Sequence, residues 1–381
     1  MKHLKKYIIL ILIAGCALML PDIAAADGNT VDFKTVIGDT AFLKLKNVSE
    51  NQIINDNAAI TPYLEDPSDH YYTLQEAYTT YEPGNLQFRL GRQKFRTGTG
   101  YAWNPTDLIT RRSPLFPDSE MEGVDSAYMA YSFFENSKIS TIYAFGNDPY
   151  RPKEEEQPID KGNCQVTVKT HAKVLDLAIH YAEARRNHTD YENGKESEAT
   201  VPVKWRLLAA GVSGEIGNLG LHAEGGHAWL NREDYPGEQG LEENTEDPFS
   251  KDHSRFLIGM DYSFENELYL VLEYYQEGLG KKSPDEYTVN DRMAFNAGER
   301  ETIGRDNVFL GAKYPIAGKA SIELYNIINA NDPSVLLNPW LIFSPNDMIN
   351  VSISAQIPVG KDEASVSESE SIAFGRIQLN F

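Results

Sequence analysis

Cysteine is nearly absent from this sequence. Cys16 and Cys164 are the two cysteines among its 381 residues, and only Cys164 lies beyond the N-terminal 26 residues. If those residues are removed on export, one cysteine cannot form an intrachain disulfide. The sequence also lacks a CxxCH haem-attachment motif, a GxSxG nucleophile elbow and a P-loop. We therefore expect no cofactor and no enzymatic activity.

Basic charge is scarce as well. The formal net charge is −21, and removal of the three lysines and one aspartate in residues 1–26 would take it to −23. Nucleic-acid affinity comes from Lys and Arg side chains that neutralise phosphates. We therefore expect no nucleic-acid partner.

Long hydrophobic runs are missing after the N-terminus. Three lysines precede an apolar run over Tyr7–Leu20, and the small-residue stretch AAAD follows it, which predicts a signal peptide over residues 1–26 and a mature chain over 27–381. An alternative is lipidation at Cys16, which ends the sequence IAGC. Under either interpretation the chain is exported from the cytoplasm. No later stretch reaches the length of about 18 residues needed for a spanning helix, so a membrane form would have to be a closed barrel.

What the sequence does contain is strict alternation of apolar and polar residues. In one stretch Leu86, Phe88 and Leu90 alternate with Gln87 and Arg89. We count 16 such segments, at 36–47, 71–83, 85–95, 124–135, 137–148, 164–174, 176–186, 203–216, 218–231, 254–265, 267–279, 307–316, 319–329, 335–345, 349–358 and 372–381. They predict an all-β fold, a transmembrane antiparallel β-barrel of about 16 strands.

The connections between these segments alternate between short and long. Short turns such as Gly217-Asn218 and Glu265-Asn266 have turn chemistry. The long polar stretches are 48–70, 96–123, 149–163, 187–202, 232–253, 280–306 and 359–371. Short periplasmic turns and long extracellular loops are typical of barrels in the cell outer membrane, which we expect as the location.

Two parts of the chain resemble a known family. The stretches LQEAYTTY, LQFRLGRQKF, GYAWNPTDL and EGVDSAYMAY, and the tail LLNPWLIFSPNDMINVSISAQIPVG, resemble Gram-negative outer-membrane porins of the DUF1302-like type. The resemblance covers residues 71–131 and 334–381, and the middle only by architecture. It implies a barrel and a pore. One family tryptophan in the bend is Thr97 here, and Trp103 is the candidate substitute.

The end of the chain also resembles a signal of this class of protein. The last segment ends on Phe381, an aromatic residue at the tip of an amphipathic strand, as in outer-membrane barrels recognised for assembly. We expect Phe381 to act as an assembly signal for the barrel assembly machinery.

The stretch 96–123 has the features of a loop that folds into the pore. Asn104, the following proline and Asp107 predict a short helix that ends near Arg111. Folded inward, it would place Asp107, Arg111 and Arg112 at a constriction, where opposed charges select solutes. The alternative is that the arginines pair with acidic residues of the same loop at the surface.

Strand parity predicts which polar side chains line the pore wall. The expected wall residues are Glu76, Arg89, Arg92, His222, Glu224 and Asp261, with Arg255, Glu273 and Glu323 on the same pattern. Arg92 breaks the parity set by Arg89 unless a bulge occurs at Gly91. His222 and Glu224 could both face one metal ion, but nothing completes a tetrahedral ligand set, so no metal is expected.

Three functions fit these features. The leading hypothesis is a porin that forms an aqueous channel for small hydrophilic solutes or ions. The alternatives are a barrel that encloses a multihaem cytochrome as part of an electron conduit, and a barrel enzyme. The expected partners are outer-membrane lipid and lipopolysaccharide, the assembly machinery, and further copies of the chain or multihaem cytochromes. The acidic loops would meet lipopolysaccharide through divalent cations.

Overall fold

The computed structural model describes residues 40–45, 77–109, 123–134, 136–145, 163–172, 174–192, 195–232, 251–296, 300–332, 334–346, 349–360 and 371–379. These contain strands β1 (Thr40–Leu45), β2 (Ala77–Tyr81), β3 (Leu86–Gln93), β4 (Val124–Phe133), β5 (Ser137–Ala144), β6 (Asn163–Ala172), β7 (Leu175–Glu192) and β8 (Lys195–Ile216). They continue with β9 (Leu219–Arg232), β10 (His253–Ser263), β11 (Tyr269–Glu277), β12 (Asp306–Ala317), β13 (Ala320–Asn329), β14 (Ser334–Asn346), β15 (Ile349–Val359) and β16 (Ile372–Leu379).

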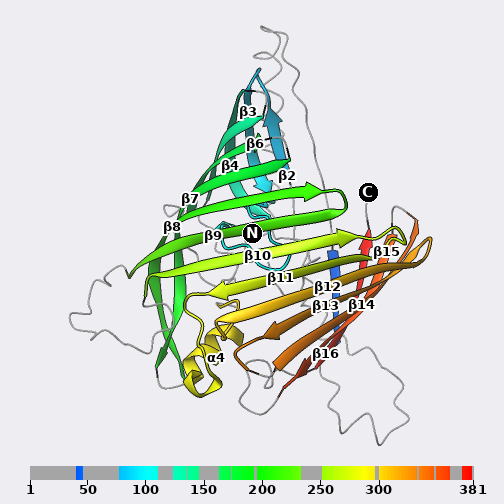
Figure 1. Ribbon diagram of the computed structural model, residues 1–381. Helices are drawn as coiled ribbons and strands as arrows, with labels where there is room; N and C mark the ends of the chain where they lie inside the picture. The colour runs from blue at the N-terminus through cyan, green and yellow to red at the C-terminus, as the bar shows by residue number, and fades with distance from the viewer. Residues whose placement is uncertain are drawn as a thin grey trace, which may run out of the picture.

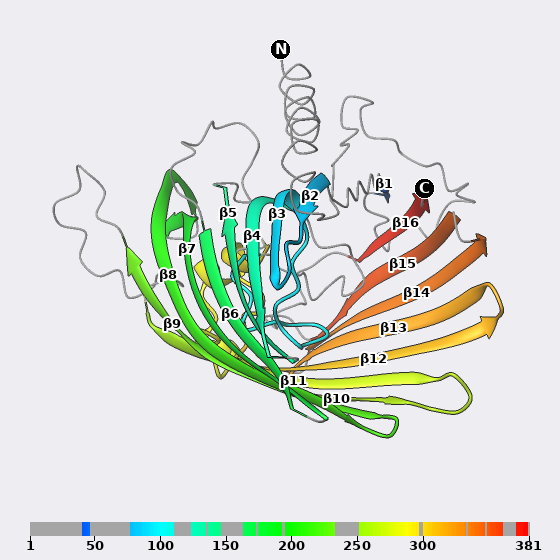
Figure 2. The same ribbon diagram turned by 90° about the horizontal axis from the view of Figure 1, so that it is seen from above.

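All these strands belong to one sheet of 16 strands (Figure 1). Each strand from β2 to β15 pairs antiparallel with the strand that follows it in sequence, and β1 pairs with β16. Each observed strand overlaps one predicted segment, so the predicted all-β antiparallel fold is confirmed. Seen from above, the sheet is a curved wall (Figure 2). Its two edges are β1 and β2, which do not pair with each other within the described residues.

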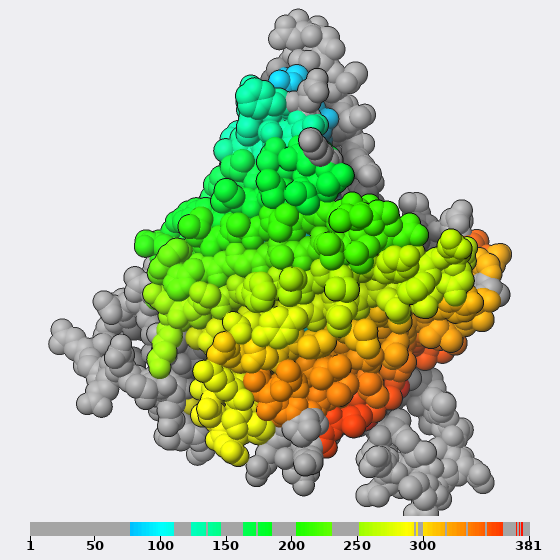
Figure 3. Space-filling model, viewed as in Figure 1, coloured from blue at the N-terminus to red at the C-terminus, as the bar shows by residue number. Residues whose placement is uncertain are grey.

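The two faces of the sheet differ in chemistry, as the alternation predicted. In β10 the side chains of Arg255 and Leu257 are buried, whereas those of Phe256 and Ile258 are 41% and 51% exposed. Across the sheet, the outward positions hold large apolar side chains, among them Leu90, Met129, Ile179, Leu208, Ile258, Leu272, Leu341 and Ile353. The convex face of β7 to β14 is a continuous surface (Figure 3).

The concave side holds the buried side chains. One cluster joins Trp103 to Leu257, Tyr275, Phe309 and further strand residues. A second gathers around Trp205 and Leu207 of β8, and a third around Phe95. These clusters contain residues of the segment after β3, so the core lies between that segment and the sheet.

Two predicted loops contain regular structure. The region 187–202, predicted as a loop, continues β7 and β8, whose ladder extends to the pair Glu192 and Lys195. The region 280–306 contains the short helix η2 (Pro284–Glu286) and helix α4 (Val289–Asn296), with a bridge between Lys281 and Gly304. Helix α4 lies at one rim and contacts β7 (Figure 1). Within the described part of the chain, no helix is both long and apolar enough to cross a membrane.

Candidate functional site

The segment after β3 turns to the concave side of the sheet (Figure 2). Its described part, residues 94–109, is largely buried, and the exposed fractions of Ala102, Trp103 and Leu108 are 0%, 1% and 1%. It contains no regular helix, so the helix predicted from Asn104 is wrong as far as the structure describes this segment. The backbone N–H of Asp107 donates to the carbonyl of Asn104 at 3.0 Å and closes one turn.

Side-chain hydrogen bonds explain why this turn does not continue as a helix. The carboxylate of Asp107 accepts the backbone N–H of Ile109 at 3.0 Å, and the hydroxyl of Thr106 donates to Glu224 at 2.7 Å. Such bonds give short polar residues an alternative to helical geometry. Asp107 is 7% exposed, and its carboxylate is bound to the backbone of its own segment.

Two carboxylates on β9 and β11, the strands on either side of β10, hold the backbone of this segment. Glu273 of β11 accepts the N–H of Tyr101 and, at 2.7 Å, the N–H of Ala102. Glu224 of β9 accepts the N–H of Gly100 at 3.2 Å. Both side chains are buried, with exposed fractions of 0% for Glu273 and 3% for Glu224. These hydrogen bonds from three consecutive backbone N–H groups to buried carboxyl groups fix the position of the segment.

Glycines allow these contacts by close approach. A Cβ atom at Gly100 would lie 1.9 Å from the carbonyl oxygen of Trp103. A Cβ atom at Gly259, on β10 between the two carboxylate-bearing strands, would lie 2.2 Å from Nε2 of His222. The absence of a side chain at Gly259 lets His222 reach across β10, where its Nε2 lies 2.8 Å from Oε1 of Glu273.

Aromatic rings anchor the same segment from the side of β11 to β13. The Trp103 ring stacks on Tyr275 with a centroid distance of 5.0 Å, and Tyr101 stacks on Phe309 at 5.6 Å. The hydroxyl oxygens of Tyr101 and Tyr325 are 3.4 Å apart. Aromatic pairs of this kind contribute beyond the area that they bury.

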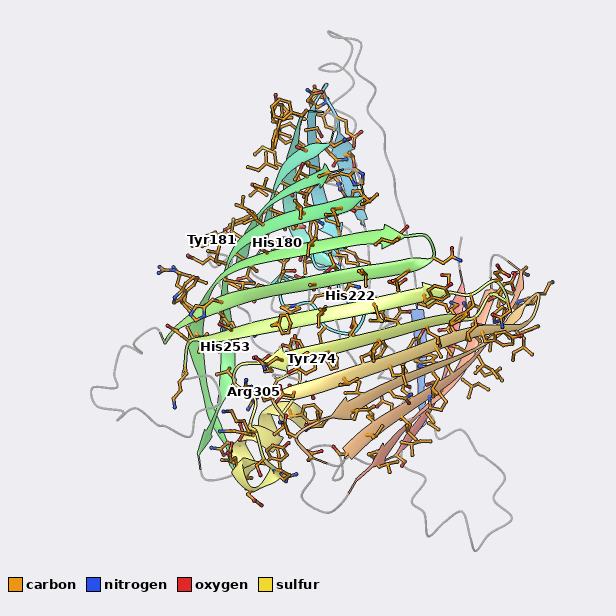
Figure 4. All side chains as sticks on the ribbon, viewed as in Figure 1. His180, Tyr181, His222, His253, Tyr274 and Arg305 are labelled. Carbon is orange, nitrogen blue, oxygen red and sulfur yellow. The ribbon has the colours of Figure 1, made fainter. Side chains whose placement is uncertain are left out.

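A polar network supports the far end of the segment. Gln165 Nε2 donates to the carbonyl of Thr106 at 3.5 Å and lies 3.4 Å from Nδ1 of His180. Thr167 Oγ1 lies 3.0 Å from the same nitrogen. Figure 4 labels His180 and its neighbour Tyr181, which occupy opposite faces of β7: His180 is 1% exposed and Tyr181 is 45% exposed.

The predicted wall residues are only partly gathered at this site. His222 and Glu224 lie on the buried face of β9, next to residues 94–109, which we call the inserted segment. Asp261, also on the buried face, forms a hydrogen bond with Tyr269. Arg89 lies on the concave side, where its guanidinium carbon is 4.4 Å from the centroid of the Tyr128 ring.

The position of Arg92 differs from the prediction. It pairs with Asp125 in an unshifted ladder, two positions after the outward Leu90, which is 56% exposed. Its Nη1 lies 3.5 Å from Oδ2 of Asp125. Gly91 has φ of 128° but adds no extra residue to either strand, so parity carries Arg92 to the outer face. The prediction that Arg92 lines the lumen is wrong.

The remaining predicted site residues, Glu76, Arg111, Arg112 and Phe381, lie outside the described residues. The sequence reasoning missed the aromatic lining made by Tyr275, Phe309 and their neighbours. The alternation in the sequence predicts which face of the sheet these residues occupy. It does not predict their contact with the inserted segment.

The rim near α4 has its own polar contacts. Arg255 of β10 lies 3.5 Å from Glu277 of β11 and 5.2 Å from the ring of Trp205 of β8. In the loop before α4, the Tyr287 hydroxyl donates to Asp332 at 2.8 Å. Burial and this hydrogen bond raise the pKa of Tyr287. Among the described residues, no three His, Cys, Asp or Glu side chains are grouped so that they could hold a metal ion.

Comparison with solved structures finds outer-membrane proteins of low identity. A triple mutant of the Rhodopseudomonas blastica porin is 11% identical, with a TM-score of 0.43 over 92% of this chain and 100% of that chain. OccK11 of Pseudomonas aeruginosa is 10% identical, with a TM-score of 0.47 over 82% and 80%. OmpT of Vibrio cholerae, an outer membrane protein in its trimer form, is 10% identical, with a TM-score of 0.42 over 93% and 99%. No protein-family model and no curated protein matches the chain.

Proposed function

We propose that this chain is an outer-membrane porin, a β-barrel with an aqueous channel for small hydrophilic solutes or ions. The observation that carries the proposal is the division of the 16-stranded sheet into an exposed apolar face and a buried face with polar groups. A spanning β-structure needs apolar side chains toward lipid and internal hydrogen bonds throughout. Residues 1–26 would direct export, and Phe381 would support assembly.

The inserted segment supports a channel over a sheath for a cytochrome. A sheath needs a lumen that accepts a folded partner, whereas residues 94–109 pack against the buried face of β8 to β13 through Glu224, Glu273 and Trp103. In the proposed porin this segment narrows the lumen. Arg111 and Arg112 follow it directly and would face the solute path as fixed positive charges.

The test is a membrane fractionation followed by recordings in planar bilayers. The protein should occur in the outer-membrane fraction, migrate differently on gels before and after boiling, and form discrete conductance steps in the bilayer. A soluble periplasmic protein without a heat-dependent shift would refute the barrel. A membrane protein that gives no conductance would refute the channel.

A further inference from the structure

Two lysines face each other on neighbouring strands β5 and β6. Lys138 pairs directly with Lys169 in the ladder. The residues beside them in the chain, Ile139 and Val168, are each 39% exposed on the outward face, so the lysines point to the concave side. Like charges that lie directly opposite each other destabilise a sheet. The fold therefore brings together two cations whose repulsion a bound anion would relieve.

Arg89 of β3 approaches the same place from the other side of β4. Its guanidinium carbon lies 4.4 Å from the centroid of the Tyr128 ring, and Nζ of Lys138 lies 5.4 Å from the same centroid. Aromatic rings attract cations at such distances, so the buried ring of Tyr128 holds an arginine from β3 and a lysine from β5 near each other. We call Arg89, Lys138 and Lys169 the basic cluster.

No carboxylate in the described part of the chain forms an ion pair with the basic cluster. A fourth cation, Arg96, acts on the charge of Lys169, and its Nη2 donates to the carbonyl of Gly100 at 3.2 Å. Three carboxylates lie in the same region, and each is bound to another group: Oδ1 of Asp176 lies 3.0 Å from Nδ1 of His171, Glu224 accepts the hydroxyl of Thr106 at 2.7 Å, and Glu82 accepts the side-chain amide of Gln87. Four cations therefore face three carboxylates that are bound elsewhere.

We propose that the basic cluster binds the anionic oxygens of a small solute, those of a carboxylate or a phosphate group. The site rests on the proposed channel, because the concave side of the sheet would be its lumen. Lys169 is exposed there, and Lys138 and Arg89 are half-buried, so a solute can reach all three side chains. The two ammonium groups would donate to the anion from adjacent strands, and the guanidinium would add further donors.

The basic cluster is separate from the constriction proposed at Arg111 and Arg112. Strand β5 begins at Ser137 and β6 ends at Ala172, so the two lysines lie near the short turns. The inserted segment and the two arginines follow the opposite end of β3, after Gln93. A solute would therefore meet positive charge at a second depth of the channel, and the substrate class that we propose is small anionic solutes.

The experiment measures binding to the purified full chain in detergent by isothermal titration calorimetry. The probe is succinate, and succinamide is its uncharged counterpart of similar size. The native protein should bind succinate about tenfold or more tightly than succinamide, and the Lys138→Gln/Lys169→Gln variant should lose about tenfold or more in affinity for succinate, the effect of about one charge-assisted hydrogen bond. Lys319→Gln removes a lysine beside another short turn, between β12 and β13, and is the matched control that should bind like the native protein.

The Lys169→Glu variant separates a binding role from a structural one. It replaces the repulsion between two opposite lysines with an attraction between Glu and Lys138, so its thermal stability should equal or exceed that of the native protein. Its affinity for succinate should nevertheless fall by about tenfold or more. A stable variant that binds succinate like the native protein would assign these lysines to the fold alone and overturn the proposal.

The remaining outcomes also decide the question. Absence of succinate binding by the native protein, equal affinity for succinate and succinamide, or an equal loss of affinity in Lys319→Gln would overturn the proposal. Conductance steps in potassium chloride are recorded on the same samples. Conductance without succinate binding would refute the anion site alone, whereas absence of conductance would refute the channel on which it rests.

Discussion

Replacement of Glu273 with alanine is expected to free the inserted segment from the wall of the sheet. The change removes the acceptor of two buried backbone N–H groups, those of Tyr101 and Ala102. A hydrogen bond to a charged group contributes about 1.5–3 kcal/mol, so the two bonds together contribute about 3–6 kcal/mol. This corresponds to a factor of about 10² to 10⁴ in the equilibrium between docked and released segment.

Amide hydrogen exchange read by mass spectrometry measures this equilibrium directly. In the Glu273→Ala variant, exchange in a peptide covering residues 95–109 should accelerate by about the same factor, while strand peptides keep their protection. Bilayer recordings should show larger or noisier conductance steps. Glu215→Ala removes the same charge at an exposed position and serves as the control. Native protection of the peptide together with native conductance would refute the assignment of Glu273 as an anchor.

Three further outcomes are expected. The Arg111→Ala/Arg112→Ala variant should conduct more and select more strongly for cations, and the selectivity shift should shrink at 1 M salt, where the screening length is about 3 Å; unchanged conductance and reversal potential would place these arginines away from the solute path. Deletion of Phe381 should lower the yield of heat-modifiable barrel far more than the conductance of each assembled pore, and a normal yield would contradict its role in assembly. Gly100→Ala should increase exchange in the inserted segment, because its Cβ would lie 1.9 Å from a carbonyl oxygen, whereas Gly318→Ala, with no heavy atom within 4 Å, should not.

The strands were predictable because their signal is local. Adjacent residues of a strand, such as Phe256 and Leu257, point to opposite faces of the sheet. Because one face is exposed and the other is buried, the same alternation recurs in every strand. The lengths of β7 and β8 were not predictable in this way. Residues 187–202 are polar enough to read as a loop, yet they pair with each other in the ladder.

The inserted segment shows where sequence reasoning stops. Asn104 and the proline after it are good helix starters, but the partners that decide the local structure, Glu224 and Gln165, come from distant strands. The orientation of Arg92 was undecided in the sequence because a glycine such as Gly91 is compatible with a bulge and with a regular strand. Register, which only the assembled sheet fixes, placed Arg92 on the outer face.

The hydrogen bonds from backbone N–H groups to Glu224 and Glu273 have a consequence for the evolution of the proposed pore. Every residue except proline supplies a backbone N–H, so an exchange of side chain at Tyr101 or Ala102 leaves the donor in place. The atoms that hold the segment are thus separate from the atoms that a passing solute would meet. Evolution or protein engineering can therefore substitute the side chains of the segment to suit a new solute. The hydrogen bonds that hold its backbone remain in place.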